Sequence, residues 1–162
     1  MKRIYPLIAI LGICAIGSTS IHAATVVVSE ATDAALRNAI ANATPGDTIA
    51  FDPSLFATGV PTIFLGGRIL IDKSLSIAGP EGGTVILDGN QREILTIDSL
   101  NPIVVNLKNL TLRNGRAKGG DGENLGTGGG GGAGMGGAIY VGNGSVNCIG
   151  VVFENNTAAG GN

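Results

Sequence analysis

The sequence of 162 residues is poor in the side chains on which most enzymes and metal sites depend. It has one histidine, two cysteines, no tryptophan and 4% aromatic residues. A zinc site with four Cys or His ligands cannot be built from this set, nor can a framework of several disulfides. Only 14% of the residues are charged and the net charge is −2, which excludes a protein that binds nucleic acid through a dense basic surface.

The N-terminus has the order of a secretory signal peptide, which we predict to span residues 1–24. Two basic residues precede an apolar stretch at residues 4–16, and small residues then lead to Ala24, after which we expect cleavage. The apolar stretch is shorter than the roughly 20 residues that span a bilayer. A retained anchor is the alternative. Cleavage would remove Cys14, His22 and two of the ten basic residues, leaving eight basic residues against twelve acidic ones.

Glycine and short aliphatic runs make up much of the remaining chain. One helix is predicted from Asp33 to Ala43 behind the N-cap Thr32, because alanine, leucine and isoleucine recur there at helical spacing. The turn Pro45–Asp47 then ends it. Brief β-branched runs between turn residues predict strands at residues 48–51, 62–65, 69–71, 75–77, 85–87, 94–97, 104–107, 110–112, 139–141, 146–148 and 151–153.

Several of these strands belong to a repeat. Val105–Asn114 and Val146–Asn155 share one pattern of apolar and polar residues at an offset of 41, and Lys73–Gly79 matches Lys108–Asn114 at an offset of 35. Such periods are typical of stacked units that bury an apolar edge against the next unit. With three strands per period, the pattern predicts an all-β parallel β-helix. Residues 25–60 would form its N-terminal cap and residues 61–162 its coils.

Stacking also predicts which side chains share a column. One inward column holds Leu75, Leu110 and Val151, the next holds Ile77, Leu112 and Phe153, and Ser76, Thr111 and Val152 point outward. Cys148 aligns with the inward Leu107, so we expect a small buried hydrophobe and not a reactive thiol. Asn114 and Asn155 fall at the following bend, where they either pair their amides between coils or act as separate surface turn residues.

The segment 115–137 interrupts the repeat. Its five consecutive glycines at 128–132 predict a flexible loop that projects from the coil. Gly132–Gly137 matches the sequence pattern of a dinucleotide-binding motif. Such a motif must be followed by a helix that binds the pyrophosphate, but here a strand follows. Gly119–Leu125 is one imperfect copy of a calcium-binding glycine repeat that works only in consecutive copies. We therefore assign no cofactor and no metal to this segment.

Acidic residues offer no clear catalytic pair. Asp72, Asp88 and Asp98 lie at strand ends, where aspartate is ordinarily a turn residue, and nothing singles out two of them for glycoside hydrolysis. No residue is assigned a catalytic role.

Two short motifs resemble those that recur in the polymorphic outer membrane protein family, and the segment near the predicted helix is similar to the N-terminal cap of secreted pectin-lyase-like β-helices. The family motif residues are Gly136, Gly137, Ala138, Ile139, Phe153 and Asn156, and the cap motif residues are Leu36, Arg37, Ile40, Gly46, Asp47, Thr48 and Phe51. The resemblance implies a passenger region of an autotransporter-type adhesin, folded as a right-handed parallel β-helix and exposed at the cell surface or outer membrane. A host-cell or glycan ligand would be its partner.

The same resemblance implies that the chain is the N-terminal part of a longer protein. Attachment to the outer membrane would then come from sequence beyond residue 162, and the open last coil would favour self-association. Two other classes remain open. Polysaccharide-degrading enzymes share the fold, and Asp88 with Arg92 is the candidate for a lyase site; a purely structural surface protein is the third class.

Overall fold

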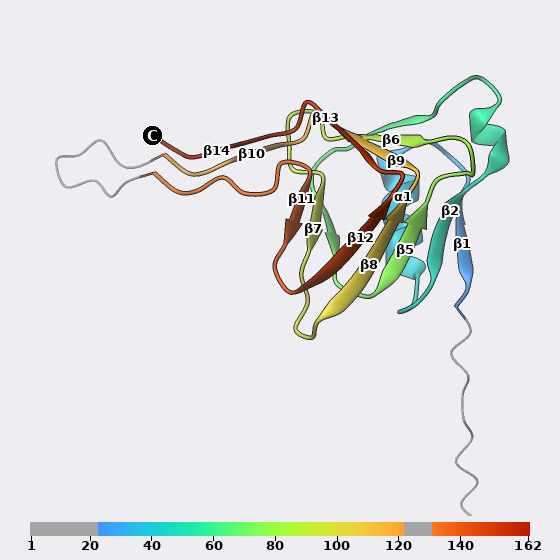
Figure 1. Cartoon of the computed structure of the whole chain (residues 1–162). Coiled ribbons are helices and arrows are strands. Elements are labelled where there is room, and N and C mark those ends of the chain that lie inside the picture. The colour runs from blue at the N-terminus through green and yellow to red at the C-terminus, as the bar shows by residue number, and fades with distance from the viewer. Residues whose placement is uncertain (1–22, 122–130) are drawn as a thin grey trace, which may run out of the picture.

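The computed structural model describes residues 23–121 and 131–162, which form an all-β structure of parallel sheets with one α-helix (Figure 1). The helices are α1 (Asp33–Asn42) and the short 3₁₀ helix η1 (Pro53–Phe56). The strands are β1 (Thr25–Val28), β2 (Thr48–Phe51), β3 (Thr62–Phe64), β4 (Ile69–Ile71), β5 (Leu75–Ala78), β6 (Val85–Asp88), β7 (Leu95–Ile97), β8 (Ile103–Lys108), β9 (Leu110–Arg113), β10 (Arg116–Lys118), β11 (Ile139–Val141), β12 (Gly144–Ile149), β13 (Val152–Glu154) and β14 (Thr157–Ala159).

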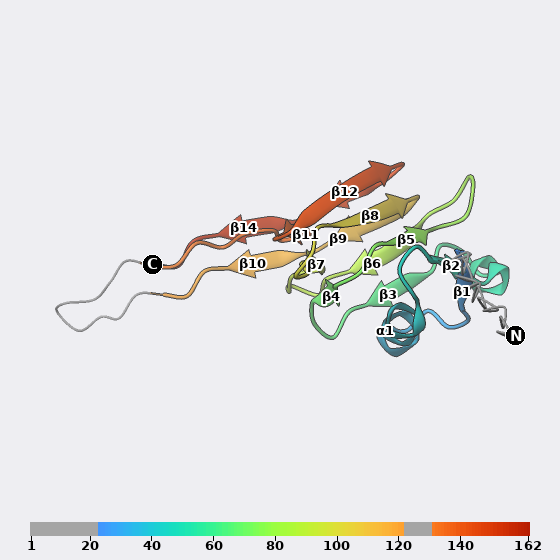
Figure 2. The same ribbon diagram turned by 90° about the horizontal axis from the view of Figure 1, so that it is seen from below.

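The chain visits three sheets in a fixed order. β2, β3 and β4 are followed by β5, β6 and β7 and then by β8, β9 and β11, and each such circuit pairs in parallel with the one before it. Figure 1 shows the three sheets as the sides of a triangle around the core. In Figure 2, α1 lies at one end of this stack of strands and β12 at the other.

The core is built from alternate residues of each strand. In β5 the buried residues are Leu75 and Ile77, and in β8 they include Val105 and Leu107. Strand side chains alternate between faces, so one apolar residue in every two points inward. Burying such a side chain contributes about 1.5–3 kcal/mol. The same alternation buries Ile49, Ile71, Val85, Leu87, Leu95, Ile97, Leu110 and Leu112.

The helix confirms the sequence prediction to within one residue. α1 ends at Asn42, with Ala43 as its C-cap, and the hydroxyl of its N-cap Thr32 accepts a hydrogen bond from the Ala35 N–H at 3.2 Å. The buried side of the helix carries Leu36, Ala39 and Ile40. It packs against the start of the first sheet, where it covers the inward side chains of the first strands.

The strand register confirms one predicted offset and corrects the other. At the offset of 41, Val105 lies opposite Val146, Leu107 opposite Cys148 and Leu112 opposite Phe153. The offset of 35 is wrong, because Leu75 lies opposite Val105, Ile77 opposite Leu107, and Leu110 opposite Val85. An alternating apolar pattern recurs on all three sides of the triangle, so pattern alone does not tell which side a strand belongs to.

Asparagines lie at the bends after β9 and β13, as predicted, but their side-chain amides do not pair with each other. Asn114 and Asn155 both have positive φ angles, 55° and 52°. The Asn114 amide donates to the Asp88 carboxylate at 2.9 Å, so of the two alternatives the amide pairing with Asn155 is not formed. A ladder does form on the outward face of the first sheet, where the Asn147 amide donates to the Asn106 side-chain oxygen at 2.9 Å.

The predicted loop at residues 115–137 contains a strand. β10 pairs with β14, and the Gly132 N–H donates to the Gly120 carbonyl at 2.7 Å. These segments run side by side in an arm that projects from the triangle (Figure 1). A Cβ on Gly161 would lie 1.9 Å from the Gly120 oxygen, so glycine permits the close approach. Most of the five-glycine run and of the calcium-like segment, like residues 1–22 of the predicted signal peptide, lies outside the described residues.

Candidate functional site

The cap motif centres on a buried aspartate. The Asp47 carboxylate accepts hydrogen bonds from the Thr44 N–H at 2.7 Å, the Ala24 N–H at 2.8 Å and the Thr44 hydroxyl at 2.9 Å. These hydrogen bonds, led by that from the Thr44 N–H, lower the pKa of Asp47. Gly46 has φ +98°, which favours glycine at the preceding turn. The contacts of Gly46 and Asp47 make these two residues structural.

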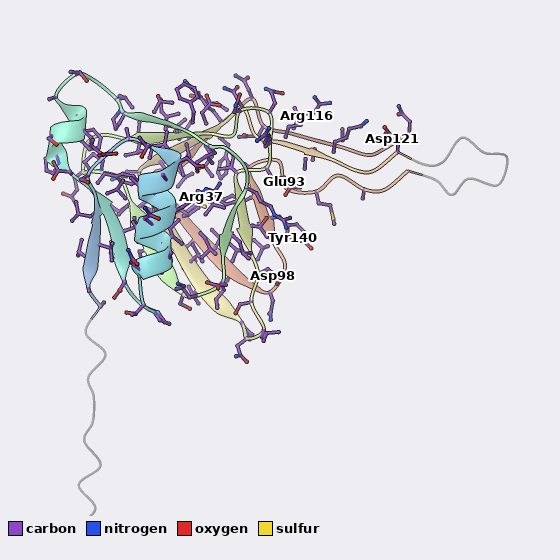
Figure 3. The ribbon with its side chains drawn as sticks, turned by 180° about the vertical axis from the view of Figure 1, so that it is seen from behind. Arg37, Glu93, Asp98, Arg116, Asp121 and Tyr140 are labelled. Carbon is purple, nitrogen blue, oxygen red and sulfur yellow. The ribbon has the colours of Figure 1, made fainter. Side chains whose placement is uncertain are left out.

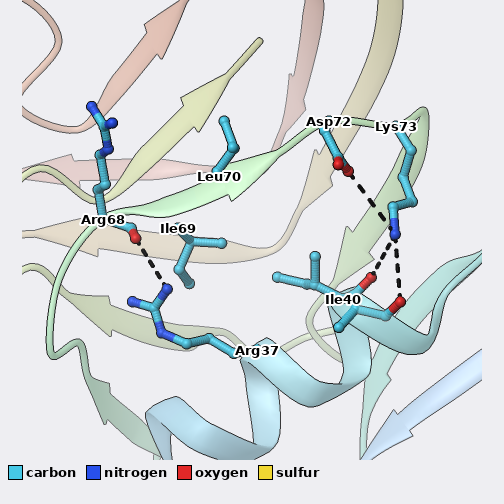
Figure 4. A pocket seen from close by; sticks show the side chains of 8 residues that line it. Arg37, Ile40, Arg68, Ile69, Leu70, Asp72 and Lys73 are labelled. Atoms are coloured by element: carbon cyan, nitrogen blue, oxygen red, sulfur yellow. Dashed lines mark hydrogen bonds and ion pairs between the residues drawn. The ribbon is translucent and has the colours of Figure 1, made fainter. Parts of the chain in front are cut away.

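The remaining cap residues hold α1 against the sheets. The Arg37 guanidinium donates to the Asp33 carboxylate at 2.8 Å and to the carbonyls of Gly67 and Arg68 at 2.5 and 3.0 Å (Figure 4). Thr48 pairs with Thr25, and the apolar members Leu36, Ile40 and Phe51 are buried. A surface pocket of about 470 Å³ lies between the helix and the loop that carries Arg68.

Lys73 is a cap residue that the sequence did not indicate. Its ammonium donates to the Ile40 carbonyl at 3.3 Å, at the C-terminal end of α1 (Figure 4). It also donates to the Ala43 carbonyl at 3.2 Å. A cation there satisfies helix carbonyls that have no partner within the helix and interacts favourably with the helix dipole. This contact could not be predicted from the sequence, because Lys73 lies some thirty residues beyond the helix.

The two family motifs meet at one junction. The Asn156 amide oxygen accepts from the Gly115 N–H at 2.7 Å, and its NH₂ group donates to the Leu112 carbonyl at 2.8 Å. A Cβ on Gly137 would lie 2.2 Å from the Thr157 oxygen, so only glycine fits. Gly136 has φ +70°. The motifs therefore lock the base of the arm to the sheets.

The other motif residues differ in their surroundings. Ala138 is buried and Ile139 is partly buried. Phe153 lies opposite Leu112, as predicted, but its side chain is 52% exposed. It belongs to the last described circuit, where no further strand covers the inward face.

The candidate lyase pair does not form. Asp88 is 4% exposed, and its carboxylate accepts from the Arg113 guanidinium at 2.8 Å, the Asn114 amide at 2.9 Å and the Asn90 N–H at 2.9 Å. Arg92 points its guanidinium at the Gly66 carbonyl. Burial raises the pKa of Asp88, but these hydrogen bonds together outweigh it and the pKa is lowered. Asp88 is thus an ionised structural anchor.

The other two aspartates lie apart from this anchor. Asp72 and Asp98 are exposed and line an open surface pocket of about 530 Å³ together with Ser99, Leu100 and Asn101. Across residues 23–121 and 131–162, no three His, Cys, Asp or Glu side chains come close enough to hold a metal ion.

The prediction that Cys148 is buried is wrong. It lies opposite the fully buried Leu107, yet Cys148 itself is exposed. The partner strand covers one side only, because β12 is an edge strand of its sheet. Partial burial still raises the pKa of the Cys148 thiol, so at neutral pH it is protonated and a weak nucleophile.

Comparison with family models, curated proteins and solved structures finds no match for this chain. Among the described residues, no helix is long and apolar enough to cross a membrane.

Proposed function

We propose that the protein is exported and that its parallel sheets form a right-handed parallel β-helix serving adhesion or display at the cell surface, as in polymorphic outer membrane and autotransporter-type passengers. The observation that carries the proposal is the repeated visit to three parallel sheets directly after an export-type N-terminus. Three strands per circuit, each pairing with the equivalent strand of the next circuit, are what a β-helix requires.

The outward face of the first sheet supports a display role. Thr25, Thr48, Ser76, Asn106 and Asn147 lie in register across its five strands. The Asn106 amide donates to the Ser76 hydroxyl at 3.3 Å, and Asn147 continues the row. Hydroxyl and amide groups at strand spacing offer regular hydrogen-bonding positions to a ligand while keeping the face wettable.

The structure bears on where the export signal would be removed. Ala24 is tied into the fold, since its N–H donates to Asp47 and its carbonyl accepts from the Thr48 N–H at 2.8 Å. Cleavage before Ala24 would keep both contacts and would place the new ammonium group beside the Asp47 carboxylate. We therefore move the proposed cleavage from after Ala24 to after Ala23.

The export proposal is tested by processing and accessibility. In cells expressing the full chain with a C-terminal tag, we expect the mature protein to begin at Ala24 by intact mass and to be degraded by protease added outside the cell. Ile10→Arg, which puts a charge into the apolar stretch, should leave the precursor unprocessed and protected, whereas the control Ile10→Leu should behave like the parent. Full-length, protected parent protein would contradict export.

A polysaccharide-degrading enzyme is the second candidate function, and it rests on fold analogy alone. The Asp88 carboxylate already accepts three hydrogen bonds from protein donors and pairs with Arg113, which disfavours it as a calcium ligand. No observation in the described residues favours this candidate over surface display.

The uncovered end of the stack supports self-association of the chain. Ile149, Val152 and Phe153 on the last strands are 62%, 48% and 52% exposed, whereas α1 covers the opposite end. Edge strands with unpaired backbone groups pair readily with a second copy. Joining of this end to the same end of a second copy would give a dimer.

Sedimentation of the purified chain measures this association directly. We expect a reversible monomer–dimer equilibrium, weakened by Phe153→Lys on the open end and unchanged by the control Phe64→Lys on an exposed position of another strand. A monodisperse monomer at all concentrations would contradict it.

A further inference from the structure

A pocket outside the cap and the family motifs gathers much of the positive charge of the molecule. It has a volume of about 320 Å³ and is lined by Arg68, Gln91, Arg92, Glu93, Arg116 and Lys118. Four of the ten basic residues of the chain line this one pocket, although the chain as a whole has a net charge of −2. We call it the basic pocket.

The fold builds the basic pocket from successive circuits. Arg68 precedes β4, Arg92 precedes β7 and Arg116 begins β10, so each comes from the next pass of the chain. The Arg116 N–H donates to the Arg92 carbonyl at 3.0 Å, which makes these two residues neighbours along the stack. Ile69 lies opposite Leu95, so Arg92 is offset by two residues from the position opposite Arg68. The three arginines therefore form a cluster across neighbouring circuits.

A left-handed turn positions Arg92. Asn90 and Gln91, immediately before it, have φ angles of 48° and 62°. The Asp88 carboxylate holds the Asn90 N–H, and the Asn114 carbonyl accepts from the Gln91 N–H at 3.0 Å. Two consecutive non-glycine residues in this conformation cost about 1–2 kcal/mol each, and such strain is found where a turn must present particular side chains.

The carboxylates near the basic pocket neutralise only half of its charge. Glu93 lies 3.6 Å from the Arg68 guanidinium, and Asp121 accepts from the Lys118 ammonium at 2.8 Å. Arg92 meets a neutral carbonyl. Arg116 is exposed beside Glu93 at the base of the arm, as Figure 3 shows. Within residues 23–121 and 131–162, two positive charges are therefore left over at this open surface pocket.

We propose that the basic pocket binds the anionic groups of a sulfated polysaccharide lying along the stack of strands. Guanidinium groups recognise oxyanions through paired hydrogen bonds, and three of the four cations are arginines. A cluster of cations from neighbouring circuits can meet several anionic units of one polymer. Gln91 and Glu93 supply hydrogen-bonding partners for sugar hydroxyls. Nucleic acid fits less well, because no aromatic side chain lines the pocket for base stacking.

This inference deepens the proposed display function by naming a ligand class, and it is tested on purified protein, so its failure is separate from a failure of export. The probe is dextran sulfate, with neutral dextran as the blank. We expect salt-sensitive binding that Arg116→Gln weakens about tenfold, the loss of one strong charged contact. The control Lys108→Gln removes a partly exposed cation from the first sheet, paired with Glu81 at 3.3 Å, and should leave affinity unchanged.

Circular dichroism of each variant checks that it folds, and Arg116→Lys serves as the conservative variant. Arg116→Lys retains the charge and should bind more tightly than Arg116→Gln. Binding no better than to neutral dextran, or equal losses in Arg116→Gln and Lys108→Gln, would overturn the proposal. Displacement of the polymer by inorganic sulfate at the same sulfate concentration would show a small-ion site, and equally tight binding of single-stranded DNA would show a general polyanion surface; either outcome also overturns it.

Discussion

Replacing Asp88 with Asn is expected to lower the free energy of unfolding by about 3 kcal/mol, the usual cost of removing one partner from a buried ion pair. The substitution leaves Arg113, with 31% of its side chain exposed, without its carboxylate, and it weakens the bonds to Asn114 and to the Asn90 N–H. Urea denaturation at pH 7 measures the loss. Asp98→Asn, at an exposed position, is the matched control and should change stability by less than about 0.5 kcal/mol.

The pH dependence of stability gives the same substitution a second readout. The pKa of Asp88 is lowered in the folded state, so its contribution is complete above the unfolded value near 3.9 and is lost as the pH falls through the folded pKa. Asp47 acts in the same direction. We expect the parent to lose stability below about pH 4 and Asp88→Asn to lose less. An unchanged acid dependence in Asp88→Asn would show that this carboxylate is not the anchor.

Truncating Leu107 to Ala is expected to cost about 3 kcal/mol, because the side chain is fully buried between Ile77 and Cys148 in one inward column. Cys148→Ala, in the same column but exposed, should cost less than about 1 kcal/mol. The two substitutions share one sheet and one register, so the difference reflects burial together with the larger number of atoms that Leu107→Ala removes. Thermal and urea unfolding of both variants provide the comparison.

Equal losses in the two variants would contradict the exposed position of Cys148 and would point to a covered end of the stack. In that case Val152 and Phe153, which share the open end, should also be protected from solvent. Protection of the β12 amides from hydrogen exchange would report the same change independently.

The Asp88 anchor also connects stability with the basic pocket. Asp88 holds the left-handed turn that carries Gln91 and Arg92, so a substitution there disturbs a pocket residue that it does not touch. Arg116 contacts this segment through its backbone N–H, which donates to the Arg92 carbonyl, so a side-chain substitution at Arg116 leaves that hydrogen bond in place. This difference explains why Arg116→Gln, and not a substitution at Asp88, is the variant for the binding test.

Local structure was predictable from the sequence wherever it depended on neighbours along the chain. The helix behind Thr32, the strand Thr48–Phe51 and the bends at Asn114 and Asn155 all lie where the residues indicated, because capping, alternation and left-handed propensity act over a few residues. The offset of 41 also held, since those two segments match over ten positions, including an asparagine that forms a ladder.

The pairing of separate strands depended on distant contacts that no local pattern encodes. Lys73–Gly79 and Lys108–Asn114 look alike, yet Leu75 pairs with Val105 and Leu110 with Val85, because every side of the triangle accepts the same alternation. The strand β10 was not predicted, because its partner β14 lies some forty residues later in the chain. The glycine-rich segment that follows β10 favours no single conformation.

The sequence by itself determined that the protein has too few cysteines and histidines for a zinc site or a disulfide framework and that its strands are short. It also fixed where aspartates and arginines stand in the chain. Only the tertiary structure decided what those groups do. It buried Asp88 as an anchor, exposed Cys148 at an edge strand, and brought Arg68, Arg92 and Arg116 into one pocket. Parallel stacking has this effect because it places residues that lie far apart in the chain within one strand spacing of each other.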